Sequence, residues 1–207
     1  MLSCVIVGAS EIFFDNLPLT DLVIAADGGL QHLRAKNINP DVIIGDFDSL
    51  AEVPQNYNII QLPREKDVSD MRAAIDYAWE QHCRVFHIYG GTDGRLDHTL
   101  ANIQCLADIA RKGGRGWLYG EREKITCVCN GVLEVSGTTG VSSPMMISVF
   151  SHGDHAEGVT LSGLKYPLKD AILRNTNPIG LSNEFIGGKA TISVECGMLV
   201  VVVGDVI

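Results

Sequence analysis

The stretch IIGDFDSL, residues 43–50, ends an apolar run with glycine and then places two aspartates around a phenylalanine. Side chains of a strand alternate between its two faces, so a strand that continues to Asp48 points Asp46 and Asp48 to the same face. At about 7 Å apart and an effective dielectric near 20, the two carboxylates repel by about 2 kcal/mol. We therefore expect water, an arginine or a metal ion beside them.

Outward from this stretch, the first half of the chain alternates short apolar runs with helical patterns. Apolar runs closed by glycine or aspartate predict strands at 4–7, 22–25, 42–44 and 85–89. Helical spacing of apolar residues occurs in two segments: Met71, Ala74, Ile75, Ala78 and Trp79, then Leu96, Leu100, Ile103, Ala107 and Ala110. Uniformly apolar strands that alternate with helices predict an α/β domain with a parallel sheet covered on both faces.

The second half has a different pattern. No helical period is convincing after RKGGRG, residues 111–116. Short strand-like runs, separated by glycine, serine, asparagine and proline, lie at 116–119, 125–129, 132–135, 145–150, 158–161, 171–173, 190–194 and 199–203. This spacing predicts an all-β domain, an antiparallel sandwich or barrel. We place the boundary at Gly113–Gly114, which gives domains at 1–113 and 114–207.

The composition excludes some classes of function. The 207-residue chain has a net charge of -9 and a pI near 5.0, which argues against a nucleic-acid-binding surface. An anionic substrate stays possible, because a bound divalent cation inverts the local charge. The six cysteines contain no C-x-x-C, and no signal-peptide pattern or membrane-length apolar run is present. We therefore expect a cytoplasmic protein with reduced cysteines and no membrane or nucleic-acid partner.

Polar motifs follow the predicted strands of the first half. In an open parallel sheet, ligands bind outside the carboxyl ends of the strands. The motifs AADGG (25–29), GDFDS (45–49) and GGTDGRLDH (90–98) lie at those ends, and REKDVSD (64–70) opens a helix. They contribute Asp27, Asp46, Asp48, Asp67, Asp70 and Asp97, together with Lys66 and Arg95. Oxygen ligands of this kind suit Mg²⁺, and the cations suit phosphate. The pattern predicts magnesium-dependent phosphate transfer.

Each of these residues also has a purely structural interpretation. Asp67 can cap the helix with Asp70 in its first turn, and Asp27 can be a turn residue or a cap. Arg95 can belong to a surface ion pair, and His98 can cap or pack. The P-loop and the G-x-G-x-x-G fingerprint are both absent from the sequence, and no histidine–cysteine spacing suits zinc.

Six pieces of the sequence, in this order, resemble the thiamine pyrophosphokinase family: ADGG, GDFDS, KDVSD, GRLDHTLAN, GLKYPL (163–168) and SNEF (182–185). The resemblance covers nearly the whole chain. It implies an α/β domain that binds ATP and magnesium, followed by a β-sandwich that binds thiamine. It also implies transfer of the pyrophosphoryl group of ATP to the hydroxyethyl oxygen of thiamine, with release of AMP. The family acts as a homodimer, with thiamine bound where one subunit's sandwich meets the other's α/β domain.

The resemblance also implies roles for individual residues. Magnesium would be held by Asp46, Asp48 and Asp70. The ATP phosphates would be bound with the help of Asp27, Lys66, Asp67 and Arg95, with Asp97 near the reacting hydroxyl. Tyr166, Ser182 and Asn183 would form the thiamine pocket. Either Asp70 or Asp97 would accept the proton of the hydroxyl group.

Three other functions are compatible with parts of this pattern. The acceptor can be another alcohol, such as a pterin. The DFD sequence is similar to a phosphohydrolase nucleophile motif, D-x-D-x-[TV], but Leu50 occupies its last position. A thiamine or nucleotide sensor without catalysis is the third possibility, although an unused cluster of carboxylates is electrostatically costly.

Overall fold

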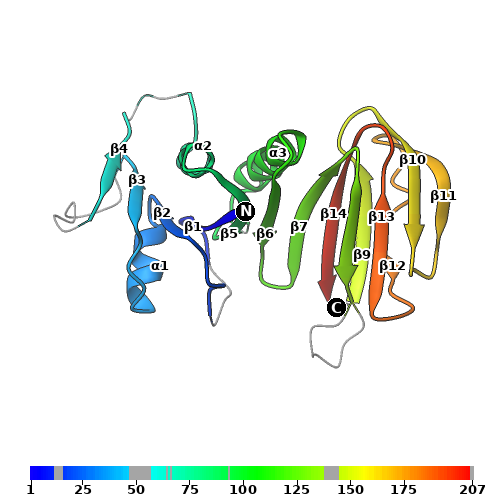
Figure 1. Ribbon diagram of the computed structural model, residues 1–207, viewed down its shortest axis with the longest axis horizontal. Coiled ribbons are helices and arrows are strands. Elements are labelled where there is room, and N and C mark those ends of the chain that lie inside the picture. The colour runs from blue at the N-terminus through cyan, green and yellow to red at the C-terminus, as the bar shows by residue number, and fades with distance from the viewer. Residues whose placement is uncertain are drawn as a thin grey trace. The chain divides into compact units, whose positions relative to one another are not determined.

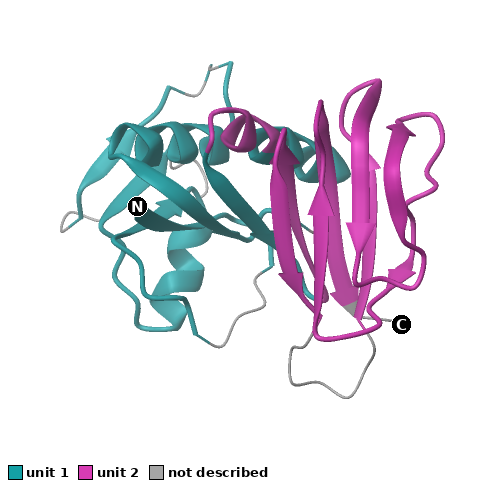
Figure 2. Ribbon diagram, turned by 45° about the vertical axis from the view of Figure 1, so that its right-hand side comes forward, with its two compact units in different colours: residues 1–106, 114–121 teal, residues 107–113, 122–207 magenta. Residues whose placement is uncertain are grey.

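The computed structural model describes residues 1–11, 16–46, 57–63, 65, 67–92, 94–137 and 145–205. It divides into two compact units (Figure 2): unit 1 is residues 1–106 with 114–121, and unit 2 is residues 107–113 with 122–207. Parallel and antiparallel strands both occur, together with helices, and a further sheet of four antiparallel strands is separate. Asp48 and Lys66 lie outside the described residues.

Unit 1 contains a parallel sheet with the strand order β6-β5-β1-β2-β3-β4. Its strands are β1 (Leu2–Val7), β2 (Leu22–Ala26), β3 (Val42–Gly45), β4 (Ile59–Gln61), β5 (Cys83–Tyr89) and β6 (Arg115–Tyr119). The four strands predicted from apolar runs in the first half are confirmed. The run at 116–119, which the sequence groups with the second half, is β6, and it pairs in parallel with β5.

Three helices accompany this sheet: α1 (Gly29–Ala35), α2 (Asp70–Glu80) and α3 (Leu96–Arg111). Leu30 and Leu33 of α1 pack against Val5 and Val7 of β1 in one buried cluster. On the other face of the sheet lies α2, which buries Met71, Ala74, Ile75 and Ala78 as its spacing predicts (Figure 1). Within the described ranges, no helix combines the length and the apolar character needed to cross a membrane.

The helix α3 is confirmed, but its predicted apolar face is only partly right. Ala107 is buried as predicted, whereas Leu96 and Leu100 are 72% and 54% exposed. The other buried residues of the helix are Asn102, Cys105, Leu106 and Ile109, which the prediction does not include. The physical reason is Asn102, a polar residue whose side chain bonds the backbone at an inward position. A pattern that counts only apolar residues passes over it and selects the neighbouring stripe.

Unit 2 is built from antiparallel strands in the orders β12-β9-β14-β7 and β11-β10-β13-β8. The strands are β7 (Glu123–Cys129), β8 (Val132–Ser136), β9 (Met145–Ser151), β10 (His155–Ser162), β11 (Leu168–Arg174), β12 (Asn183–Glu184), β13 (Lys189–Ser193) and β14 (Met198–Asp205). Burial alternates strictly along β8 and β9, which is typical of strands with one covered face. The predicted strands of this half exist, and the two-residue β12 has no sequence signal of its own.

Candidate active site

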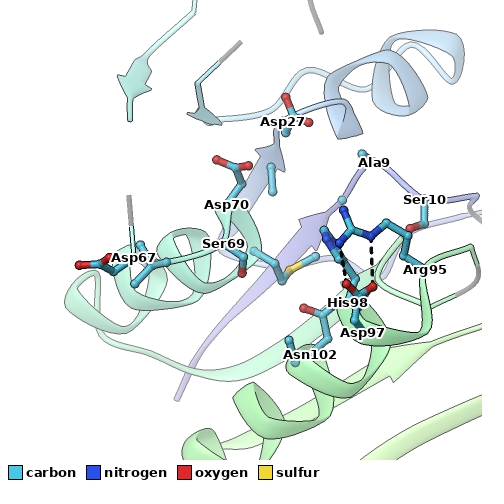
Figure 3. A pocket seen from close by; sticks show the side chains of 16 residues that line it. Ala9, Ser10, Asp27, Asp67, Ser69, Asp70, Arg95, Asp97, His98 and Asn102 are labelled. Carbon is cyan, nitrogen blue, oxygen red and sulfur yellow. Dashed lines mark hydrogen bonds and ion pairs between the residues drawn. The ribbon is translucent and has the colours of Figure 1, made fainter. Parts of the chain in front are cut away.

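A cavity of about 770 Å³ opens in unit 1 beside the carboxyl ends of the strands (Figure 3). It is lined by the segment after β1, the segment after β2, the start of α2 and the start of α3. Five residues that the sequence singles out lie on its wall: Asp27, Asp67, Asp70, Arg95 and Asp97. The convergence expected at the edge of a parallel sheet therefore occurs for these five residues.

Asp46 follows β3 directly and is partly buried, but it is not among the residues that line this cavity. Its chain neighbour Gly45 approaches Asp27 closely, because a Cβ atom on Gly45 would lie 3.1 Å from the Cα atom of Asp27. The amide of Asp27 also donates to the carbonyl of Ile44 at 2.8 Å. The backbones that carry Asp27 and Asp46 are therefore adjacent at the same sheet edge.

The start of α2 is capped by Ser69 rather than by Asp67. The Ser69 hydroxyl accepts a hydrogen bond from the Arg72 amide at 3.2 Å, with the extended backbone that a cap requires. The interpretation of Asp67 as the helix cap is therefore wrong, because a serine two residues later takes that place. Asp70 is the first helical residue, where the helix dipole favours its negative charge. Asp67 and Asp70 both remain on the cavity wall.

Arg95 and Asp97 form a bidentate ion pair before and within the first turn of α3. The guanidinium Nε atom is 3.1 Å from Oδ1 and Nη2 is 2.5 Å from Oδ2. The amide of His98 also donates to Oδ1, at 3.0 Å. The hydrogen bonds from Arg95 hold the pKa of the Asp97 carboxyl below its ordinary value, and the same pair raises the pKa of Arg95. Both groups are exposed, so a phosphate can reach the guanidinium.

The segment after β1 is a part of the site that sequence reasoning missed. Gly8, Ala9 and Ser10 line the cavity, and the Ser10 amide donates to the carbonyl of Gly90 at 3.2 Å. A Cβ atom on Gly8 would lie 2.5 Å from the oxygen of Gly90, so only glycine fits there. The available signal is that the predicted strand at 4–7 ends in a glycine followed by two small residues.

Asn102, the last residue of the GRLDHTLAN segment, also lies on the cavity wall, although no role was predicted for it from the sequence. It is 6% exposed, and its Nδ2 atom donates to the carbonyl of Gly91 at 2.7 Å. The sequence signal is a carboxamide at an inward position of an otherwise apolar helix face.

The residues predicted for thiamine lie together in unit 2. Asn183 is 4% exposed; its Oδ1 atom accepts from the Tyr166 amide at 2.9 Å, and its Nδ2 atom donates to the Tyr166 carbonyl at 2.7 Å. The amide of Ser182 donates to the hydroxyl of Ser148 at 3.0 Å. Beside them, Lys165 pairs with Glu184 at 2.8 Å. The segments GLKYPL and SNEF are thus joined, and the carboxamide of Asn183 serves to hold Tyr166.

Side-chain oxygen atoms on the wall of the unit 1 cavity come from four aspartates, two serines and Asn102. In the part of the chain that the structure describes, no three or more histidine, cysteine, aspartate or glutamate side chains are grouped to enclose a metal ion. Mg²⁺, however, typically takes one or two carboxylates and completes its shell with water and substrate phosphates. Asp27 and Asp70 on the wall, with Asp46 close to Asp27 in the backbone, fit that requirement.

The first unit is an α/β domain with a charged cavity at the carboxyl edge of its parallel sheet, which is where such domains bind ligands. Two family models match the chain: "Thiamin pyrophosphokinase, catalytic domain" over residues 16–117 and "Thiamin pyrophosphokinase, vitamin B1 binding domain" over residues 127–199. The chain therefore belongs to the thiamin pyrophosphokinase family, whose known reaction is pyrophosphoryl transfer from ATP to thiamine.

Individual relatives agree with this assignment over nearly the whole chain. The sequence is 28% identical over 204 residues to the thiamine pyrophosphokinase of Bacillus subtilis (strain 168), with 94% of each chain covered. A solved thiamine pyrophosphokinase from Bacillus subtilis has a TM-score of 0.89 at 27% identity and covers 99% of this chain and 100% of its own. A thiamin pyrophosphokinase from Geobacillus thermodenitrificans has a TM-score of 0.85 at 25% identity, with 98% and 97% covered.

Proposed function

We propose that this protein transfers the pyrophosphoryl group of ATP to thiamine and that the unit 1 cavity is where the transfer takes place. The observation that carries the proposal is the gathering of Asp27, Asp67, Asp70 and Asp97 with Arg95 on one cavity wall. Carboxylates can hold a divalent cation on a polyphosphate, and the guanidinium can bind its oxygens. Membership of the family selects thiamine as the acceptor over a pterin or water.

Magnesium is the cofactor that this donor set supports. Asp46, Asp48 and Asp70 would hold the ion, with Asp67 nearby and with Asp27 and Lys66 beside the nucleotide. When bound, magnesium supplies positive charge that offsets the charge of the phosphate oxygens. Without that charge, four carboxylates on the cavity wall would repel a triphosphate.

The chain's own residues would orient the reactants and move one proton. The hydroxyethyl oxygen of thiamine forms a bond to the β-phosphorus of ATP, the bond from that phosphorus to the oxygen bridging to the α-phosphorus breaks, and AMP leaves with the bridging oxygen. Arg95 would stabilise charge on the phosphate oxygens, since its guanidinium is exposed on the cavity wall. The hydroxyl proton passes to a carboxylate. That carboxylate would be Asp70 or Asp97; the hydrogen bonds from Arg95 lower the pKa of Asp97 and so make it a weaker proton acceptor than it would be without this partner.

We propose a division of labour between a catalytic first domain (1–113) and a thiamine-binding second domain (114–207), with the two antiparallel sheets of the latter packed as a β-sandwich. Its alternating burial supports a face-to-face packing of the sheets. Tyr166 and Ser182 would contribute to its thiamine-binding surface, with the exposed ring of Tyr166 available for stacking, and the buried carboxamide of Asn183 would hold Tyr166 in place.

A homodimer is part of the same proposal. Two residues close to Ser182 and Asn183 in the sequence, Leu181 and Ile186, have large exposed apolar side chains, and the ring of Tyr166 is exposed as well. Apolar groups of this kind are covered when two subunits meet around a ligand. We also propose a cytoplasmic location, because all six cysteines are free thiols, as a reducing compartment would keep them.

Phosphorus NMR of the purified protein with ATP, magnesium and thiamine tests the function. We expect AMP and thiamine diphosphate to appear in step, and neither to appear when thiamine is omitted. Formation of ADP would indicate a kinase instead, and free phosphate would indicate a hydrolase. Product with a pterin alcohol but not with thiamine would assign a different acceptor.

A further inference from the structure

We infer that Asn102 is a positioning residue of the active site, because its buried carboxamide fixes the orientation of the Gly91 peptide beside the cavity. This inference rests on the proposed function, since it names a residue that shapes the site where ATP would bind. Asn102 would act through the backbone and not by touching the reacting atoms.

The first support is the chemistry of the position. Asn102 lies in the second turn of α3, on the same inward face as Cys105, Leu106 and Ile109. A buried carboxamide is unfavourable there unless it is hydrogen-bonded, and an apolar residue would pack as well. The Asn102 side chain has such a partner, since Nδ2 donates to the Gly91 carbonyl at 2.7 Å. The polar residue is therefore explained by the carbonyl that it binds.

The second support is the tightness of the loop that receives this bond. A Cβ atom on Gly91 would lie 2.9 Å from Leu118 Cδ1 and 3.0 Å from Asn102 Nδ2, so the backbone approaches both side chains without spare room. Gly90, the preceding residue, has a φ of +63° and accepts a hydrogen bond from Ser10. The loop after β5 is thus held on one side by the loop after β1 and on the other by Asn102.

The third support is the location of these groups. Asn102, Gly90 and Ser10 all line the 770 Å³ cavity, together with Arg95 and Asp97. Phosphoryl transfer depends mainly on how the reactants are positioned, so a displaced loop lowers the rate even when every charged group is present. Loss of the Asn102 donor should therefore lower kcat/KM for ATP by about 10- to 100-fold, because a buried carbonyl is left without its partner. The KM for thiamine should change little.

The test compares Asn102→Leu with Asn102→Asp in the full-length protein. Leucine has no donor, whereas a protonated aspartate can donate to the Gly91 carbonyl and an ionised one cannot. Burial at this position should raise the pKa of the new carboxyl well above its ordinary value, so that part of it stays protonated at mildly acidic pH. We expect kcat/KM for ATP of N102D, divided by that of the wild type, to fall as pH rises from 5 to 9. The same ratio for N102L should be low and independent of pH. Asp70, Arg95, Asp97 and His98 are present in all three proteins, so their titration largely cancels in the ratio.

A matched control is Ser151→Ala in unit 2. The Ser151 hydroxyl is also nearly buried and donates to a loop glycine, the carbonyl of Gly153, at 2.9 Å. We expect S151A to lose some stability in urea while keeping the wild-type kcat/KM for ATP.

Three results would overturn the inference: wild-type kcat/KM for ATP in N102L, a loss no larger than that of S151A, or a pH-independent ratio in N102D. If N102L does not fold, the pH profile of N102D decides alone. If the wild type forms no AMP, it is the proposed function that fails. Calorimetric titration with ATP and magnesium then tests the loop separately, and unchanged affinity in N102D at pH 9 would reject the role of Asn102.

Discussion

Asn102 in unit 1 and Asn183 in unit 2 are both almost completely buried, and each uses its carboxamide to hold a backbone segment. The segments differ in what surrounds them. Around Asn102 lie a large cavity, four aspartates and an arginine. Asn183 holds Tyr166, whose side chain is 59% exposed. Unit 1 thus offers charges on a fixed backbone, which suits a polyphosphate and a cation, whereas unit 2 offers an aromatic ring on a fixed backbone, which suits a heteroaromatic vitamin.

The largest expected effect is in the charged cavity. Asp70→Asn should lower kcat by about 10²- to 10⁴-fold, because it removes both a cation ligand and a candidate proton acceptor. Asp46→Asn should have a similar effect if Asp46 holds magnesium as proposed. Initial rates of AMP formation measure both variants. Asp76→Asn is the matched control on the same helix, since Asp76 pairs with Arg72 outside the cavity wall. Equal activity of D70N and D76N would refute the catalytic assignment.

Arg95 should show the next largest effect. Arg95→Lys should lower kcat/KM for ATP by about 100-fold, because an ammonium cannot reproduce the bidentate contact of a guanidinium with phosphate. The urea midpoint should stay the same, since both partners of the Arg95–Asp97 pair are exposed. Arg72→Gln breaks a comparable pair on α2 and should leave the kinetics unchanged. A large loss of stability in R95K would instead assign Arg95 a structural role.

Unit 2 should respond mainly in stability and in the KM for thiamine. Asn183→Ala removes three hydrogen bonds, to the amide and carbonyl of Tyr166 and from the amide of Glu184. We expect a loss of about 2–4 kcal/mol in the free energy of unfolding and a higher KM for thiamine, with the KM for ATP unchanged. Asn130→Gly, which removes one exposed hydrogen bond from the Gly197 amide and suits the φ of +44° at this position, should cost about 1 kcal/mol or less. If N183A instead raised the KM for ATP and left the KM for thiamine unchanged, unit 2 would not be the unit that binds thiamine.

The face of α3 gives a smaller effect. Leu100→Ser should change the free energy of unfolding by about 0.5 kcal/mol or less, because the side chain is mostly exposed. Leu106→Ala on the buried face should cost about 2–5 kcal/mol. Urea denaturation of the two variants compares the faces directly. If L100S lost more unfolding free energy than L106A, the buried face of α3 would be the one predicted from apolar spacing.

The smallest effect is the titration of Asp97. Because its pKa in the folded protein lies below the ordinary value of 3.8, the ion pair contributes stability above that value and loses it as pH falls through the folded pKa. Carboxyl carbon NMR should place the Asp97 midpoint below 3.8 in the wild type and higher in Arg95→Gln. An identical midpoint in both proteins would show that Arg95 is not the cause.

The sequence predicted correctly those helices and strands whose own residues carry a recognisable pattern. The strands β1, β2, β3 and β5 each contain a short apolar run, which only His87 interrupts in β5, and α2 has helical spacing of its apolar residues from Met71 to Trp79. The seven residues of α1 and the three of β4 are too short for a period to be recognised. The sequence of β6 predicts a strand but carries no information on its partner, which is set by contacts with β5 that are distant in the chain.

One rule about parallel sheets was enough to predict part of the site. Carboxyl ends of parallel strands meet at one edge, so the aspartates after β2 and before α2 were expected near Arg95 and Asp97. Asn102, in contrast, depends on a carbonyl in a loop eleven residues earlier, and Asn183 on a backbone segment seventeen residues earlier. Both asparagines belong to segments that the sequence singles out, GRLDHTLAN and SNEF, but the sequence does not show which backbone group each side chain binds, because every residue offers a carbonyl.

The path of the chain between the units affects how the protein is made. The chain leaves unit 1 after residue 106, returns to it at residues 114–121 and then leaves again. During synthesis, the first 106 residues would emerge with β5 as an uncovered sheet edge, because β6 is still inside the ribosome. Uncovered strand edges are sites of aggregation in partly folded chains. A nascent chain that stalls before β6 emerges should therefore depend on chaperones more than a chain that stalls after β6 has emerged and paired with β5.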